Sequence, residues 1–128
     1  MLDAAPLSTA LTDLVDAWGT VHRIATAVEI EGDPVPTESD QDLLRISQEA
    51  LSNVSRHAGA RSVQVRLSYV EEGVLLDIVD DGTGFDAGAV HEGNGLRGMR
   101  ERMAGSGGTV GVVTAPGSGC VVSAAVPA

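Results

Sequence analysis

Residues 40–57, DQDLLRISQEALSNVSRH, carry the clearest periodic pattern in the chain. Apolar residues recur there at helical spacing, so they would line one face of a helix. That face comprises Leu43, Leu44, Ile46, Ala50, Leu51 and Val54. Ser39 or Asp40 can cap the start of this helix, and Gly59 can end it. We therefore predict an amphipathic helix over 40–57 whose apolar face packs on the core.

Shorter patterns flank this helix on both sides. Before it, we predict a helix, a strand and a loop, over 7–18, 20–30 and 31–38. After it, we predict two strands joined by a tight turn, over 62–69 and 74–79, and a glycine-rich loop over 80–95. A helix over 96–104 and two final strands over 109–114 and 120–126 follow. This order lacks the regular alternation of a parallel doubly wound sheet. It predicts an α+β fold, with a mixed, mostly antiparallel sheet and about three helices on one face.

Size and composition narrow the class of protein. A chain of 128 residues suits one domain over 1–128. Its 8 basic and 18 acidic residues give a net charge of −10, which opposes nonspecific nucleic-acid binding through Lys and Arg. No apolar run reaches the roughly 20 residues of a membrane-spanning helix, and Met1–Leu7 lacks the pattern of a secretory signal. A lone Cys120 indicates a reducing, cytoplasmic setting.

The polar edge of the 40–57 helix is a first candidate site. Glu49, Asn53 and His57 are spaced by four and share one face, with Arg56 beside them. Carboxylate and amide oxygens suit Mg²⁺, and the guanidinium and imidazole suit phosphate oxygens. An ordinary solvated helix face would have the same spacing. This pattern alone therefore leaves both interpretations open.

A second candidate is the run Asp80-Asp81-Gly82-Thr83-Gly84-Phe85 at the end of a predicted strand. Glycines let a ligand approach the backbone closely, because no side chains intrude. A carboxylate at this point can accept a hydrogen bond from an exocyclic amine. A hairpin turn with solubilising aspartates would also explain the run.

A third candidate is GNGLRGMRER, residues 93–102. Glycines immediately before a helix leave backbone N–H groups directed at an anion, where the helix dipole also favours negative charge. No Gly-Lys-Ser/Thr follows, so the run is not a P-loop.

Together the three motifs resemble the catalytic domain of the GHKL ATP-binding (HATPase_c) superfamily. The closest likeness is to sensor histidine kinases whose partners are response regulators of LuxR type. Residues 44–58 resemble that family's N box, residues 80–85 its G1 box and residues 93–102 its G2 box, followed by a Gly107-Gly108-Thr109 turn. The resemblance covers almost the whole chain and implies a Bergerat-type α/β sandwich.

The resemblance also implies roles by position. Asn53 would hold Mg²⁺, with Glu49 near the metal or its water, and these two would be the catalytic residues. Arg56 and His57 would face the phosphates of ATP, while Asp80 would bind the adenine amine.

The remaining predicted binding residues lie in the glycine-rich runs. They are Gly82 and Gly84 beside Asp80, and Gly93, Gly95 and Leu96 on the phosphate side. Residues 86–92 would form a short lid over ATP.

The chain departs from the family pattern in two places. Cys120 follows Gly117-Ser118-Gly119 where the family usually has Thr, which would weaken a polar contact beneath the adenine. No dimerising hairpin with a phosphoacceptor histidine precedes the N box. We place His22 in a strand or its approach and His91 in the lid, and neither as an acceptor.

The resemblance implies an ATP- and Mg²⁺-binding kinase domain that does not phosphorylate itself when isolated. It would be monomeric and would supply the γ-phosphate to a histidine on the kinase's dimerisation domain, from which a response regulator takes it. The domain would be cytoplasmic, and in a membrane-anchored full-length kinase it would lie on the cytoplasmic side. A stand-alone GHKL ATPase using Glu49, an anti-sigma serine kinase and a degenerate nucleotide-binding module are the rival interpretations.

Overall fold

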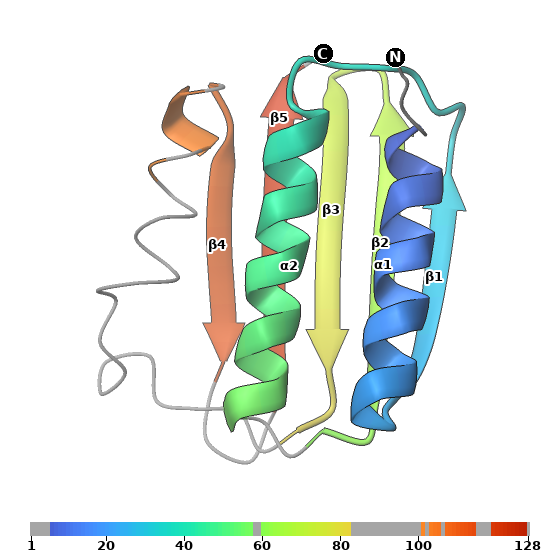
Figure 1. Cartoon of the computed structure of the whole chain (residues 1–128). Helices are drawn as coiled ribbons and strands as arrows, with labels where there is room; N and C mark the ends of the chain where they lie inside the picture. Colours follow the sequence, from blue (N-terminus) through green and yellow to red (C-terminus); the bar gives the residue numbers. More distant parts are fainter. Residues whose placement is uncertain are drawn as a thin grey trace.

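The described part of the chain forms a five-stranded sheet with helices packed on one face (Figure 1). The computed structural model describes residues 6–57, 60–82, 101, 103–105, 107–114 and 119–127. The strands lie in the order β1-β2-β3-β5-β4, where β1 and β2 are parallel and all other neighbours antiparallel. Their bounds are β1 Ala25–Glu31, β2 Ser62–Val70, β3 Gly73–Asp80, β4 Thr109–Thr114 and β5 Cys120–Pro127. The predicted α+β sandwich with a mixed, mostly antiparallel sheet is confirmed.

Two long helices cover this sheet. Helix α1 spans Leu7–His22 and packs on β1, and helix α2 spans Asp40–His57 and packs on β3 and β5. Residues 101 and 103–105 are helical as well, within or next to the predicted third helix. The bounds of α2 are those that its apolar period predicted.

The core lies between the helices and the sheet. Strands β2, β3 and β5 direct alternate side chains toward the helix-covered face of the sheet, as the period of two in their sequences requires. The fully buried large side chains are Leu11, Val15, Leu43, Ile46, Leu51, Val63, Val65, Leu67, Leu76, Ile78 and Met103. This packed layer fixes α2 against β3, and thereby fixes the ends of both elements.

The cap of α2 differs in part from the prediction. The Ser39 carbonyl accepts the Leu43 N–H at 2.9 Å, so Ser39 is the N-cap residue directly before the first helical residue, Asp40. The side-chain bonds come from Thr37, whose hydroxyl donates to Asp40 Oδ1 at 2.9 Å and accepts the Ser39 N–H at 3.2 Å. The predicted end at Gly59 lies outside the described residues.

The first helix is longer than predicted, and the strand after it is shorter. The sequence predicted a helix that ends at Trp18. In the structure α1 continues through Gly19, which is buried, and a Cβ there would lie 2.7 Å from the Thr26 side chain. Glycine is therefore needed for α1 to approach β1. His22 is the last residue of α1, so its placement in a strand was wrong.

Candidate functional site

The candidate site lies at the end of the sheet where β3 finishes. Figure 1 shows that the carboxyl ends of α2 and β3 and the start of β5 meet at this end. Asp80, the last residue of β3, pairs in register with Val63 of β2 and Cys120 of β5. The fold thus brings the second half of α2 to the same end as Asp80, although 27 positions separate Asn53 from Asp80.

Asp80 is a buried carboxylate, with only 6% of its surface exposed. Its Oδ1 accepts the backbone N–H of Gly82 at 2.9 Å, which holds the side chain against the turn that leaves β3. Burial raises the pKa of Asp80, the Gly82 hydrogen bond opposes this shift, and the charge of Asp81 adds to it. A carboxylate held in this way is a directional acceptor for a donor on a ligand.

Asp81 has a different role from its neighbour. Its Oδ1 accepts the backbone N–H groups of Arg61 and Ser62, both at 2.9 Å, and its Oδ2 accepts the Ser62 hydroxyl at 2.9 Å. These hydrogen bonds lower the pKa of Asp81 and tie the start of β2 to the end of β3. The motif resemblance gave a role to Asp80 and none to Asp81, and no pattern in the sequence marks the long-range bond to Ser62.

Gly119 packs against the backbone of Asp80. Its φ is +75°, and a Cβ at this position would overlap the Asp80 carbonyl oxygen. Only glycine meets both conditions without strain. Cys120, the predicted departure from the family pattern, follows directly and is buried, with 7% of its surface exposed.

The predicted residues of α2 are described in part. Glu49 is exposed and Asn53 is half-buried, and their spacing of four places them on one face of the helix. Arg56 and His57 belong to the last turn of α2, but their side chains lie outside the described part.

Within the glycine-rich runs, Gly82 is described and contacts Asp80 as expected. Gly84, Gly93, Gly95 and Leu96, and the lid predicted over 86–92, lie outside the described residues. In the part that is described, no group of three or more His, Cys, Asp or Glu side chains is arranged to hold a metal ion. Nor is any described helix long and apolar enough to cross a membrane.

Comparison with known protein families identifies the chain. Residues 38–128 match the family model described as "Histidine kinase-, DNA gyrase B-, and HSP90-like ATPase". This match covers α2, the whole sheet except β1, and the Asp80 end. The chain belongs to this family. Membership of the HATPase_c family implies that the domain binds ATP.

Relatives within the HATPase_c family are sensor kinases. The chain is 33% identical over 127 residues to the sensor histidine kinase LiaS of Bacillus subtilis, covering 98% of this chain and 35% of LiaS. It is 39% identical over 100 residues to the sensor protein VraS of Staphylococcus epidermidis, covering 77% of this chain and 29% of VraS. The chain therefore spans about a third of the length of these relatives. It is homologous to catalytic ATP-binding domains of sensor histidine kinases.

Solved structures of HATPase_c proteins share the fold. The histidine kinase domain of the blue-light activated histidine kinase of Erythrobacter litoralis superimposes with a TM-score of 0.81 at 24% identity, covering 98% of this chain and 65% of that one. A second structure of that kinase gives a TM-score of 0.77 at 28% identity, covering 95% of this chain and 42% of that one. The sequence likeness to LiaS and VraS favours the kinase domain over the rival interpretations.

Proposed function

We propose that this chain is the ATP- and Mg²⁺-binding catalytic domain of a two-component sensor histidine kinase. The observation that carries the proposal is the buried Asp80 carboxylate beside Gly82 and Gly119, in a chain whose family binds ATP. The domain would supply the γ-phosphate to a histidine on a separate dimerisation domain. A response regulator, of LuxR type by the resemblance of the motifs, would then receive the phosphoryl group on an aspartate.

Asp80 would select adenine. Its carboxylate would accept a hydrogen bond from the exocyclic amine of the base, and burial would exclude the water that competes for this bond. Guanine has a carbonyl oxygen where adenine has the amine, so a carboxylate would repel it. The close approach of Gly119 to the Asp80 backbone would keep this acceptor fixed in position.

The second half of α2 would contact Mg²⁺ and the phosphates of ATP. Asn53 would hold Mg²⁺ through its amide oxygen, with Glu49 near the metal or its water, because hard oxygen ligands suit this ion. When bound, Mg²⁺ supplies neutralisation of the phosphate charge. Arg56, His57 and the backbone around Gly93, Gly95 and Leu96 would orient the phosphates. The contribution of the domain to catalysis would be positioning and charge stabilisation.

Calorimetric titration with ATP and Mg²⁺ tests the adenine site. Wild type should bind ATP saturably and should not bind GTP, while Asp80→Asn should lose at least about tenfold in affinity, because the acceptor of a desolvated hydrogen bond changes to a neutral amide. Asp77→Asn is the matched control, since it removes the same charge from the outer face of the same strand. Retained ATP affinity in a folded Asp80→Asn protein would refute the assigned pocket.

A titration with and without Mg²⁺ tests the metal role. Asn53→Ala should abolish the gain in ATP affinity that Mg²⁺ brings, because the amide oxygen that positions the ion is lost. Gln48→Ala, an exposed position on the same helix, should keep the full gain. An unchanged metal dependence in Asn53→Ala would exclude Asn53 as the ligand.

A further inference from the structure

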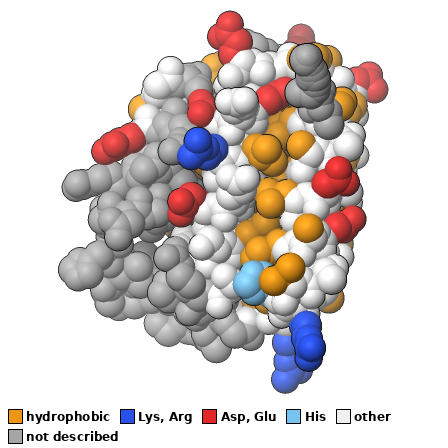
Figure 2. Space-filling view, viewed as in Figure 1, with side chains coloured by type: hydrophobic (Ala, Val, Ile, Leu, Met, Phe, Trp, Pro, Cys, Tyr) orange, Lys and Arg blue, Asp and Glu red, His pale blue; other side chains and the backbone are white. Residues whose placement is uncertain are grey.

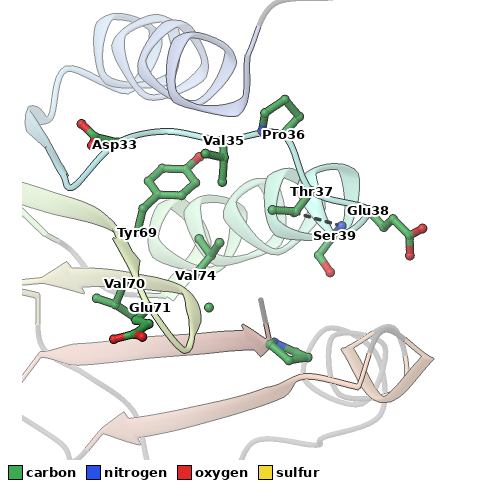
Figure 3. A pocket seen from close by; sticks show the side chains of 12 residues that line it. Asp33, Val35, Pro36, Thr37, Glu38, Ser39, Tyr69, Val70, Glu71 and Val74 are labelled. Carbon is green, nitrogen blue, oxygen red and sulfur yellow. Dashed lines mark hydrogen bonds between the residues drawn. The ribbon is translucent and has the colours of Figure 1, made fainter.

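A second hollow lies at the other end of the sheet, far from Asp80. It has a volume of about 660 Å³ and opens between the loop that precedes α2, the β2–β3 turn and the end of β5 (Figure 3). Gly73, at its wall, and Asp80 stand at opposite ends of β3, about 23 Å apart at the rise per residue of a strand. The hollow is therefore separate from the proposed nucleotide site.

The interior of this hollow is apolar and partly open to water. Val35 is 52% exposed and Val70 is 42% exposed, large values for aliphatic side chains that face a concave surface. The other apolar lining residues are Pro36, Tyr69, Val74 and Pro127. Covering such side chains removes apolar area from water and thereby stabilises a complex. The lining thus favours an occupant with an apolar side chain.

The charges around the hollow are all of one sign. Asp33, Glu38 and Glu71 line it, and its described lining contains no Lys, Arg or His. In Figure 2 acidic side chains lie at this end of the molecule and along its sides, while basic side chains lie both at the opposite end and in the upper half of the face shown. Arg23 follows α1 and Arg61 precedes β2, which places both at the Asp80 end. This polarity favours a cationic occupant at the hollow.

Tyr69 adds a site for a cation between these carboxylates. Its half-buried ring projects into the hollow between Asp33 and Val35 (Figure 3). Burial, and then the charge of Asp40, raise the pKa of Tyr69, so its phenol stays neutral at physiological pH. The face of a neutral tyrosine ring attracts guanidinium and ammonium groups.

The loop that lines the hollow is fixed by contacts within the unbound chain. Gly32 has φ +79°, and a Cβ there would overlap the Tyr69 carbonyl oxygen, so the loop packs directly on the β2 backbone. Thr37 closes the same loop through its bonds to Ser39 and Asp40. A preformed wall lowers the entropic cost of binding.

A neighbouring cavity extends the surface. It has a volume of about 410 Å³ and shares Val35 and Pro36 with the hollow, while Leu7 and Pro34 belong to its far side. An extended peptide crossing Val35 and Pro36 could therefore place one side chain in each cavity.

We propose that this hollow docks a basic peptide segment of another protein, with an Arg or Lys between the carboxylates and a bulky apolar side chain on Val35 and Val70. The cationic group would lie against the Tyr69 ring. Binding would be independent of ATP, because the two sites lie at opposite ends of the sheet. This docking site is separate from the proposed kinase function and does not depend on it.

Selection from a random-peptide phage library on the purified chain tests the proposal, followed by fluorescence anisotropy with the selected peptides. The selected peptides should be enriched in Arg or Lys next to a bulky apolar residue. Glu71→Gln should weaken their binding about threefold and the double variant Glu38→Gln/Glu71→Gln about tenfold, in the range of partly screened ion pairs. Val35→Ser should weaken it about fivefold through lost apolar contact.

Glu72→Gln is the matched control, because Glu72 is adjacent to Glu71 in the turn but does not line the hollow. The peptide affinity of Glu72→Gln should equal that of wild type, and circular dichroism of every variant should show an intact fold. The proposal is overturned if no peptide is retained, if the selected peptides lack basic residues, or if Glu72→Gln weakens binding as much as Glu71→Gln. Self-association of the free chain that Val35→Ser abolishes would also overturn it, since the occupant would then be a second copy.

Discussion

Two adjacent aspartates at the end of β3 have pKa values shifted in opposite directions. Asp80 is buried and its pKa is raised, whereas Asp81 accepts hydrogen bonds from Arg61 and Ser62 and its pKa is lowered. Folding therefore disfavours the ionised form of Asp80 and favours the ionised form of Asp81. A buried acceptor that destabilises the free domain is typical of a site built for a ligand.

The pH dependence of the free energy of unfolding should distinguish the role of Asp80 from that of Asp81. The ionised form of Asp80 is disfavoured in the folded state. Asp80 therefore lowers the free energy of unfolding increasingly as the pH rises above 3.8, the ordinary pKa of an aspartate. Asp80→Asn should therefore be more stable than wild type at pH 7, with the difference closing toward pH 3.8. Asp81 stabilises the fold above 3.8 and loses this effect as the pH falls through its lower folded pKa. Asp81→Asn should accordingly be less stable at pH 7.

Urea unfolding of wild type and both variants, at pH 7 and near pH 3.8, measures these differences. Shifts of the same sign for the two variants at pH 7 would contradict the opposite roles of the two carboxylates.

Among the elements, α2 could be predicted from the sequence and α1 only in part. The apolar period of α2, from Leu43 to Val54, depends on local spacing alone, and the same holds for the alternation in β2. The extension of α1 to His22 depends on a contact between Gly19 and Thr26 of the next strand. Such a tertiary contact overrides helix propensity and leaves no local signal.

In the candidate site, too, local features could be predicted from the sequence and tertiary contacts could not. Asp80 and its Gly82 partner lie within one short motif, so the sequence was sufficient to nominate them. The bond from Asp81 to Ser62 and the approach of Gly119 to Asp80 join segments far apart in the chain, and they became visible only in the fold. The hollow around Tyr69 was likewise not predicted, because its lining comes from three separate segments.

Strand β1 is an edge strand, and its charges should keep the domain monomeric. Arg66 Nε of β2 lies 3.2 Å from Glu29 Oε1 and 3.7 Å from Glu31 Oε2, both on β1. Charged side chains on an edge discourage pairing with a second chain. Wild type should sediment as a monomer in analytical ultracentrifugation, and Glu29→Val/Glu31→Val should self-associate. A dimeric wild type, or a monomeric variant at the same concentration, would contradict this role.

At the scale of the whole molecule, the domain should bind ATP without phosphorylating itself. His22 stacks near Trp18, with ring centroids 5.1 Å apart, on a helix that packs against β1 and α2, whereas Asp80 lies on β3. Helix α1 ends at the same end of the sheet as Asp80, so the labelling experiment decides whether His22 accepts the γ-phosphate, and we expect the acceptor on the dimerisation domain instead. Incubation with ATP labelled on the γ-phosphate should leave no acid-labile phosphate on the chain.

His22→Gln is the control for that experiment, and its background should equal that of wild type. Adding a dimerisation domain from a related sensor kinase should restore labelling, on the added domain. Labelling of the isolated chain that disappears in His22→Gln would overturn the assignment of an external acceptor.

The insertion of β5 between β3 and β4 also constrains the order in which the sheet can assemble during translation. Strands β1, β2 and β3 can pair as soon as they leave the ribosome, but β4 has β5 as its sheet neighbour and β3 keeps an open edge until β5 arrives. A nascent chain that stalls before Cys120 would expose this edge, which is rich in apolar residues, to other chains. The last strand to be synthesised is thus the one that protects the centre of the sheet from aggregation.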